Sequence, residues 1–247
     1  MASQLSQHIV SAFDRDLEGI QAHIMKMGGL VEAAIRDSAK SLESRDEELA
    51  EEVRRRDASI DELDTLVNEE AARVIALRAP TATDLRVALS VLRMSNNLER
   101  IGDLAKNMAK RTGVLVQLQP IDGAAASLRR MAREVELMLK DALDSYIQRD
   151  PELARDVIER DRDVDQMYNT AFREFLTFML EDPRNITACM HLHFIAKNIE
   201  RMGDHVTGIS EQVVFLVEGA MPEQKRPKAD ATSTDPRFSP EAGEGED

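Results

Sequence analysis

The chain contains two copies of one sequence unit, and this internal repeat restricts the possible fold more than any other feature. The pentapeptide ERIGD at residues 99–103 returns as ERMGD at residues 200–204. Further upstream, residues 44–63 align with residues 148–167. A duplicated unit with the length of a small domain predicts two similar substructures in one chain, related by a pseudo-twofold axis.

The first copy has the pattern of three long helices. Apolar residues recur at helical spacing over about residues 13–43, and a second helix runs over about residues 46–77, where Asp46 opens it. Pro80 ends this second helix. Thr81 and Asp84 have the spacing of a capping box, and they start a third helix that reaches about Val116.

The second copy repeats this pattern with clear start signals. Asp150-Pro151 and Asp182-Pro183 each place an acidic N-cap before a proline at the first helical position. Short loops force consecutive helices to lie antiparallel, so we expect an all-α fold of two tandem three-helix bundles. The predicted bundles cover residues 10–118 and 119–220.

The end of the chain differs in composition from the rest. From Pro222 onward it contains three further prolines, one aromatic residue and many charges. Such a segment cannot bury enough apolar surface to fold. We therefore predict that residues 221–247 form a disordered acidic C-terminal tail.

The charge balance restricts the class of partner. Lysine and arginine total 32 against 46 acidic residues, which gives a formal net charge of −14. A surface of this sign repels a nucleic-acid backbone, so we expect no nucleic-acid binding. Cations and basic protein surfaces are the more compatible partners.

The N-terminal segment and the single cysteine indicate a cytoplasmic protein. The first 20 residues lack the basic and apolar segments of a secretory signal, and no apolar run has the length of a membrane span. Cys189, flanked by Ala188 and Met190, has the surroundings of a small buried hydrophobe.

Pairs of acidic residues separated by one helical turn occur at matching places in both copies. Like charges at this spacing destabilise a helix by about 0.2–0.5 kcal/mol per pair, so a bound cation would reverse the effect. If the second and third helices of each bundle are neighbours, four carboxylates converge on one point, which suits Mg²⁺, Ca²⁺, Mn²⁺ or iron. The candidate ligands are Asp57, Asp61, Glu99 and Asp103 in the first half, and Asp161, Asp165, Glu200 and Asp204 in the second.

Glycine inside each repeated pentapeptide supports the same hypothesis. Gly102 and Gly203 each weaken a helix by about 1 kcal/mol relative to alanine. Their missing side chains permit close approach of a neighbouring helix at the acid pairs. The adjacent Arg100 and Arg201 are expected to form salt bridges or contacts with a neighbouring helix.

Two other interpretations use the same residues. The acid pairs of a helical scaffold can be solvated without binding metal. A carboxylate-bridged di-metal enzyme is the less favoured alternative, because such sites use Glu-x-x-His pairs and the sequence contains none. His193 and His205 lie near the second acid group, and a solvated role is favoured over a ligand role.

Four segments resemble the PhoU family of phosphate-specific transport accessory proteins. DLRVALSVLRMSNNLERIGDLAKNMAKR and HFIAKNIERMGDHVTGISEQV are similar to the two signature segments of the family. RDASIDEL and RDRDVDQM fit its second and fifth helices. Two positions differ between the copies, because Leu104 stands where His205 stands and the DLR at residues 84–86 has no counterpart.

The resemblance implies a function without catalysis. It implies surface metal clusters at the same eight acidic residues, with magnesium, manganese or iron as the cation. It also implies a cytoplasmic adaptor, often a homodimer, which associates with the phosphate ABC transporter. Through the phosphate-sensing histidine kinase, such an adaptor acts as a negative regulator of phosphate uptake and of the phosphate regulon.

Overall fold

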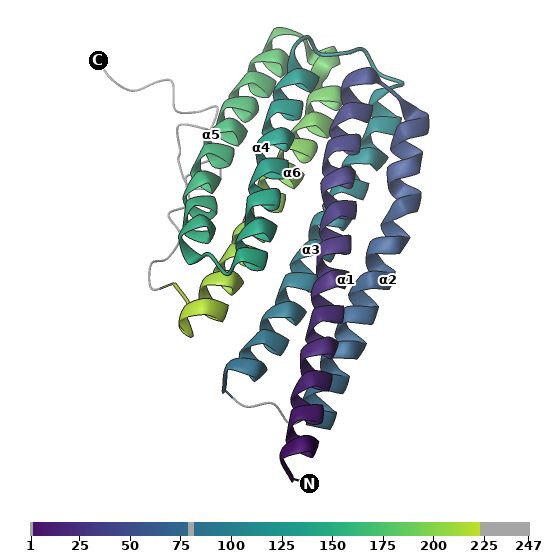
Figure 1. The fold of residues 1–247 in the computed structure, drawn as a ribbon. Helices are drawn as coiled ribbons and strands as arrows, with labels where there is room; N and C mark the ends of the chain where they lie inside the picture. Colours follow the sequence, from purple (N-terminus) through teal and green to yellow (C-terminus); the bar gives the residue numbers. More distant parts are fainter. Residues whose placement is uncertain (1, 79–81, 223–247) are drawn as a thin grey trace, which may run out of the picture.

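Six long α-helices make up the described part of the chain, which covers residues 2–78 and 82–222 of a computed structural model (Figure 1). The helices are α1 (Ala2–Ser44), α2 (Glu47–Arg78), α3 (Ala82–Leu115), α4 (Ala124–Gln148), α5 (Pro151–Glu181) and α6 (Ile186–Glu218). A short 3-10 helix, η1 (Pro183–Asn185), precedes α6. Over these residues there is no strand, which confirms the predicted all-α class.

The first helix is longer than the sequence pattern predicts. It begins at Ala2 instead of about residue 13. Residues 2–12 contain neither proline nor glycine, so no residue in this segment interrupts the helix. Pro80, Thr81 and the predicted tail from residue 223 onward lie outside the described residues.

The predicted aspartate caps are present. The Oδ1 atom of Asp46 accepts a hydrogen bond from the backbone N–H of Leu49, at 2.9 Å. Asp150 caps α5 in the same way, and its Oδ1 accepts from two backbone N–H groups of the first turn. Asp182 caps η1 instead of starting an α-helix directly, so the last long helix begins three residues later than Asp182-Pro183 predicts.

The ends of α1 and α4 show that the repeat extends to backbone conformation. Arg45 and Arg149 occupy matching positions after the two helices and have left-handed φ values of 54° and 52°. The following residue in each copy donates its backbone N–H to a serine carbonyl five residues earlier, at 2.9 Å. This pattern satisfies carbonyl groups at the helix end, and the left-handed residue turns the chain into the next helix.

The two copies pack together as one body with two layers (Figure 1). Helices α1 and α4 contact each other in one layer, and α3 and α6 contact each other in the second. At the two edges, α2 packs against α1 and α3, while α5 packs against α4 and α6. Consecutive helices in each copy are antiparallel, as the short loops predict.

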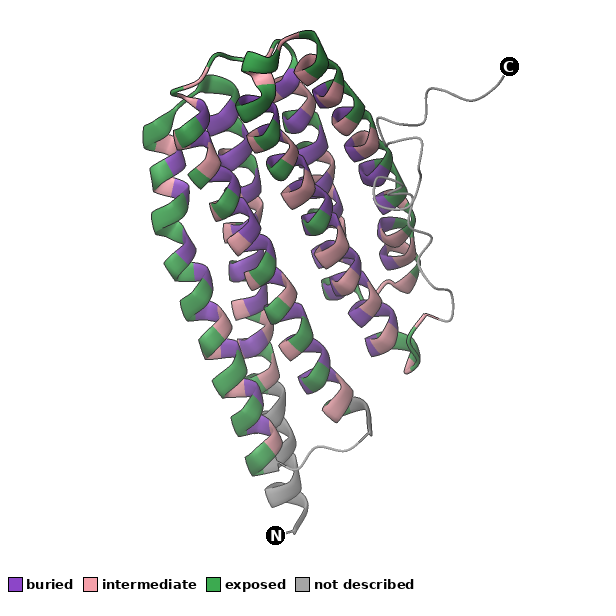
Figure 2. Cartoon of the chain, turned by 180° about the vertical axis from the view of Figure 1, so that it is seen from behind, coloured by how far each residue is buried: buried purple, intermediate pink, exposed green. Residues whose placement is uncertain are grey.

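A single hydrophobic core runs through both copies. The apolar stripes predicted for the third helix of each copy are buried, including Leu98 and Ile101 on α3 and Ile199 and Met202 on α6. Cys189 is also buried, as predicted. The buried residues lie on the sides of the helices that face one another, and exposed residues follow the outer sides (Figure 2). Because the core is continuous, each copy helps to bury the apolar face of its neighbour.

Candidate functional site

The first set of acid pairs lies where α2 packs closely against α3. Gly102 permits this approach, because a Cβ atom at that position would lie 3.0 Å from Cδ1 of Ile60 and 3.4 Å from Oδ1 of Asp57. The glycine inside ERIGD therefore brings the backbone of α3 next to the Asp57 carboxylate of α2. This confirms the reason predicted for its presence. We call this region the first acidic seam, with Asp57, Asp61, Glu99 and Asp103 as its predicted ligands.

The second seam repeats this arrangement between α5 and α6. A Cβ atom on Gly203 would lie 2.7 Å from Oδ1 of Asp161 and 3.5 Å from Cγ1 of Val164. Real Cβ atoms do not approach an oxygen this closely, so any other residue at this position would force the Asp161 carboxylate to move. The second acidic seam contains Asp161, Asp165, Glu200 and Asp204.

Four of the eight predicted ligands are buried, which differs from the surface clusters that the family resemblance implies. Asp161 and Asp165 are each 1% exposed, and Glu200 is 2% exposed. Asp57 is 4% exposed in the first seam, where Asp61 is exposed and the other two acids are intermediate. A buried carboxylate is costly unless a positive charge or hydrogen bonds compensate it, so the seams need counter-charges.

A lysine supplies such a charge in the first seam. Nζ of Lys106 donates a hydrogen bond to Oδ2 of Asp57 and lies 3.5 Å from Oδ1 of Asp103. Arg100 lies on the outer side of the same acids, with Nε 3.4 Å from Oε2 of Glu99. The salt-bridge role predicted for Arg100 is confirmed.

A different lysine position serves the second seam. Nζ of Lys197 lies 3.0 Å from Oε1 of Glu200, and it also lies over the ring of Tyr168, at 4.8 Å from the ring centroid. In the repeat alignment, Thr207 stands where Lys106 stands in the first copy. The lysine of the first seam thus follows its pentapeptide along the chain, and the lysine of the second seam precedes its pentapeptide.

The electrostatics of the first seam reflect burial and crowding of carboxylates. Partial desolvation at the helix contact raises the pKa of Asp61, although the residue is exposed, and the Asp57 carboxylate raises it further. Burial also raises the pKa of Glu99. The hydrogen bond to Asp57 raises the pKa of Lys106, so this lysine is protonated at neutral pH. The seam is therefore a set of carboxylates arranged around an ammonium group.

The donor chemistry of both seams suits a hard cation, because every candidate ligand is a carboxylate oxygen. In the conformation described, however, no group of three or more histidine, cysteine or acidic side chains within residues 2–78 and 82–222 is arranged to hold a metal ion. Binding would require the carboxylates to turn toward one point and Lys106 to leave Asp57. The eight predicted ligands are in the right places along the helices, and their metal binding stays a prediction.

The two histidines near the second seam have other neighbours. The ring of His193 packs against Tyr168 and Phe172, with ring centroids 5.9 and 5.2 Å apart. Nδ1 of His205 lies 2.9 Å from Oδ1 of Asn97 on α3. The contact of His205 connects the two copies, which the sequence pattern alone did not indicate.

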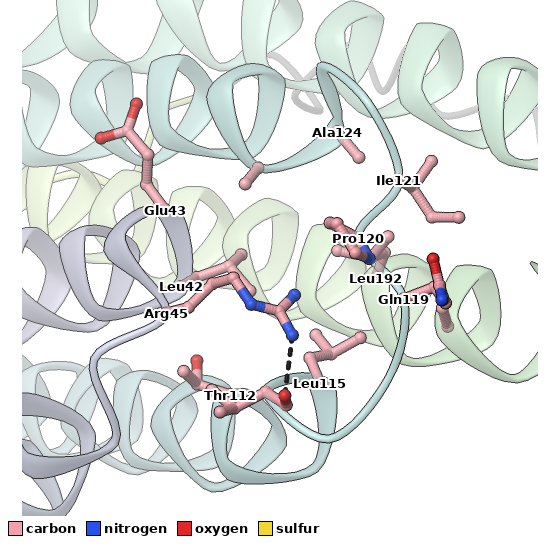
Figure 3. Close-up of a pocket in the computed structure, with 13 residues that line it drawn as sticks. Leu42, Glu43, Arg45, Thr112, Leu115, Gln119, Pro120, Ile121, Ala124 and Leu192 are labelled. Carbon is pink, nitrogen blue, oxygen red and sulfur yellow. Dashed lines mark hydrogen bonds between the residues drawn. The ribbon is translucent and has the colours of Figure 1, made fainter.

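A small cavity of about 90 Å³ lies away from the acidic seams, where the ends of α1 and α3 meet the loop that leads to α4 (Figure 3). The Arg45 guanidinium extends across its edge and donates to the backbone carbonyls of Val116 and Leu118, at 2.7 and 2.8 Å. Arg45 thus fixes the connection between the two copies. The cavity is lined mainly by apolar residues and contains none of the predicted ligands.

Sequence reasoning missed the two lysines of the seams. Lys106 follows Asp103 by three residues and Lys197 precedes Glu200 by three residues, a spacing that places each lysine beside an acid on the same helix. This local signal was available in the sequence. The approach of Lys106 to Asp57 depends on the packing of α2 against α3, which the spacing does not specify.

None of the described helices has the length and apolar composition needed to cross a membrane.

Comparisons with known proteins agree on one family. The PhoU domain matches residues 24–112 and again residues 128–213, which correspond to the two copies. The chain is 44% identical over 227 residues to a protein of Rhizobium meliloti (strain 1021) named as a phosphate-specific transport system accessory protein PhoU homolog, and the match covers 92% of this chain and 96% of the relative. A homologue of the same description from Caulobacter vibrioides (strain NA1000 / CB15N) is 42% identical, with coverage of 93% and 100%.

Solved structures show the same fold. The crystal structure of PhoU from Pseudomonas aeruginosa matches with a TM-score of 0.82 and 36% identity, and the match covers 84% of this chain and 100% of that protein. The phosphate transport system regulatory protein PhoU from Streptococcus pneumoniae matches with a TM-score of 0.78 and 26% identity, over 86% and 100% of the two chains. With the doubled domain match, these similarities establish that the chain belongs to the PhoU family.

Proposed function

We propose that this protein is a cytoplasmic adaptor that represses the response to phosphate starvation. It acts on the phosphate ABC transporter and on the phosphate-sensing histidine kinase, and it carries out no catalysis itself. Two observations carry this proposal. The PhoU domain matches the chain twice, at residues 24–112 and 128–213, and the relatives that match over 92% and 93% of the chain are named as accessory proteins of phosphate-specific transport.

The architecture suits an adaptor. Two copies of one helical unit share a continuous core, so the molecule presents long, rigid faces to its partners. No step of this function needs a reacting group, and the buried carboxylates of Asp57 and Glu200 lie against lysines. The di-metal enzyme stays the less favoured alternative.

We also propose that the acidic seams bind a divalent cation or iron. Carboxylate groups from two helices would hold the ion, which would supply positive charge between them and fix the angle between α2 and α3, and between α5 and α6. The scaffold without metal stays the alternative, in which the lysines alone supply the counter-charge. Elemental analysis of protein purified without chelator separates the two.

Deletion of the gene tests the regulatory proposal. In cells grown with plentiful phosphate, loss of a repressor switches on a reporter driven by a phosphate-starvation promoter, and expression of the intact chain restores repression. A reporter that stays off in the deletion strain contradicts the proposal.

A pull-down tests the partners. Membranes from phosphate-replete cells are solubilised, and proteins that remain bound to the tagged chain are identified by mass spectrometry. Components of the phosphate transporter and the sensor kinase are the expected partners. A homodimer, which the family resemblance implies, is tested on the purified chain by light scattering.

A further inference from the structure

One face of the molecule has a charge opposite to that of the chain as a whole. Helices α3 and α6 form this layer, and their outer sides point the same way because α1 and α4 cover their inner sides. From Leu89 to Val114 on α3, and from Ile186 to Val217 on α6, every acidic residue is buried or only partly exposed. We call these outer sides the α3–α6 face. It is turned toward the reader in Figure 2, which views the molecule from behind Figure 1.

Cations are spread along the length of this face. They are Arg93, Arg100 and Lys110 on α3, and Arg201 on α6. Across the residues that the structure describes, Arg93, Lys110 and Arg201 form no ion pair with a carboxylate. The chain as a whole has a formal net charge of −14, so this concentration of exposed cations is not a property of its average surface.

The edge helices provide the contrast. On α5 the exposed residues include Glu152, Asp156 and Glu159. Arg155 and Arg160 there are neutralised locally, since Arg155 contacts Glu152 and Glu218, and Arg160 contacts Glu134 and Asp141. Arg93, Lys110 and Arg201 of the α3–α6 face are therefore available to a partner, while Arg100 of this face pairs with Glu99 and Asp103 on its own helix.

The pseudo-twofold relation brings the repeated arginines together. Asn97 on α3 contacts His205 on α6, and Arg111 contacts His191 further along, so the two helices run antiparallel. Arg100 lies one turn after Asn97, and Arg201 lies one turn before His205. Arg100 of ERIGD and Arg201 of ERMGD therefore lie at the same level along the contact between α3 and α6, one from each copy.

Apolar side chains continue the face toward one end. Ile186, Met190 and Phe194 are spaced one turn apart on α6 and are 46%, 40% and 43% exposed. Val114 on α3 is 43% exposed beside them. The Arg111 guanidinium lies 4.3 Å from the centroid of the Phe194 ring, which holds this aromatic side chain at the surface.

We propose that the α3–α6 face binds a protein partner whose contact surface carries carboxylates around an apolar centre. This inference rests on the regulatory function proposed above and assigns its contact surface. Exposed aromatic, Met and Arg residues are typical of protein contacts, and opposite charges speed and orient association.

Charge complementarity favours this occupant over two others. An anionic bilayer would attract the cations of the face but would be repelled by the rest of a chain with a net charge of −14. A second copy bound face to face would place the same arginines and lysine against each other across a twofold axis. A protein partner avoids both objections when its carboxylates are confined to the contact area, because the acidic remainder of the chain then does not face them.

The test compares two double variants with the same change of charge. Lys110→Glu with Arg201→Glu alters the face, while Arg130→Glu with Arg162→Glu alters exposed arginines on α4 and α5. Binding is measured by biolayer interferometry against the purified cytoplasmic ATP-binding subunit of the phosphate transporter and the purified cytoplasmic part of the sensor kinase. For at least one of these probes, the face variant should bind at least about tenfold more weakly and the control within about twofold of wild type.

A substitution that removes an apolar side chain tests whether binding depends on the α3–α6 face itself or only on net charge. Phe194→Ser keeps the net charge and should also weaken binding, while circular dichroism should show unchanged helix content. Binding of the wild type should weaken as salt is raised. If the wild type binds but both variants on the face bind as the control does, the surface assignment is wrong and the regulatory function stands. If the wild type binds neither probe, both proposals are overturned.

Two further measurements address the other occupants. Wild-type protein should not sediment with vesicles that contain phosphatidylglycerol. Sedimentation that Lys110→Glu with Arg201→Glu abolishes would assign the face to lipid and overturn the proposal. Light scattering gives the oligomeric state of the wild type and of the same double variant. If the wild type is a dimer and the double variant is a monomer, the face is used for self-association and the proposal is overturned.

Discussion

Lys106 on α3 donates a hydrogen bond to Asp57 on α2, so an ammonium group lies at the seam where the sequence predicts a cation. Asp57 is buried, and Gly102 lets the two helices approach closely at this point. The lysine and a metal ion would neutralise the same carboxylate. They therefore compete for the first seam, and the balance between them can be measured.

Replacement of this lysine should destabilise the protein and increase its response to metal. Lys106→Met leaves the Asp57 carboxylate without its ammonium partner and should lower the free energy of unfolding by about 1–2 kcal/mol, less than for a fully buried pair. The lysine side chain is 41% exposed, so water partly replaces it. Addition of Mn²⁺ should restore more stability to Lys106→Met than to the wild type in urea unfolding.

Lys110→Met is the matched control, because this lysine lies one turn further along α3 and is exposed. It should unfold as the wild type does, with or without Mn²⁺. Equal effects of the two substitutions would show that Lys106 is not the counter-charge of the seam.

A Cβ atom at the second pentapeptide glycine should disrupt the contact of α5 with α6. Gly203→Ala places this atom 2.7 Å from Asp161 Oδ1, and relief of the clash should cost about 1–3 kcal/mol. Gly29→Ala on α1 is the control, since nothing lies within 4 Å of its Cβ and alanine favours a helix by about 1 kcal/mol. Thermal unfolding should rank the variants Gly29→Ala, wild type and Gly203→Ala in order of falling stability. An unchanged Gly203→Ala protein would contradict the close packing.

Divalent cations should stabilise the wild type through the acidic seams. A ligand that binds only the folded state at 100 times its Kd adds about 2.7 kcal/mol to the free energy of unfolding. The melting temperature of the wild type should therefore rise with Mn²⁺, and that of the double variant Asp103→Asn with Asp204→Asn should rise much less. Equal shifts in the two proteins would rule out these acids as ligands.

The protonation of His191 should depend on Arg111. Burial lowers the pKa of His191, and the Arg111 guanidinium, 3.3 Å away, lowers it further. Because the folded state binds this proton less readily than the unfolded state, His191 reduces stability as the pH falls below its ordinary pKa of 6.5. NMR titration should show a pKa below 6.5 in the wild type and a higher value in Arg111→Gln.

His191→Gln provides the stability readout for the same pair. The loss of unfolding free energy between neutral pH and pH of about 5.5 should be smaller in this variant than in the wild type. An identical loss in both proteins would mean that His191 has the same pKa in the folded and unfolded states.

The sequence predicted features that depend on neighbouring residues along one helix. Asp150 caps α5 because an aspartate before a proline has a strong local preference. Leu98 and Ile101 are buried because their spacing marks one side of α3. The role of Gly102 was also predictable, because a helix retains glycine at a cost unless a neighbour needs the space.

Features that depend on packing between distant segments were not predictable in this way. Periodicity does not specify that α3 packs against α6, so the contact of Asn97 with His205 could not be derived. The same holds for the burial of Asp161, which follows from the approach of two helices. The α3–α6 face required both the layer arrangement and the exposure of each residue.

The continuous core has a consequence for any attempt to separate the two repeats. If the chain were cut in the loop between α3 and α4, the first fragment would expose the apolar sides of α1 and α3, and the second would expose those of α4 and α6. Neither fragment would then be a self-sufficient protein, and the two would associate into a non-covalent heterodimer when mixed. The duplication has thus produced two units that depend on each other for solubility.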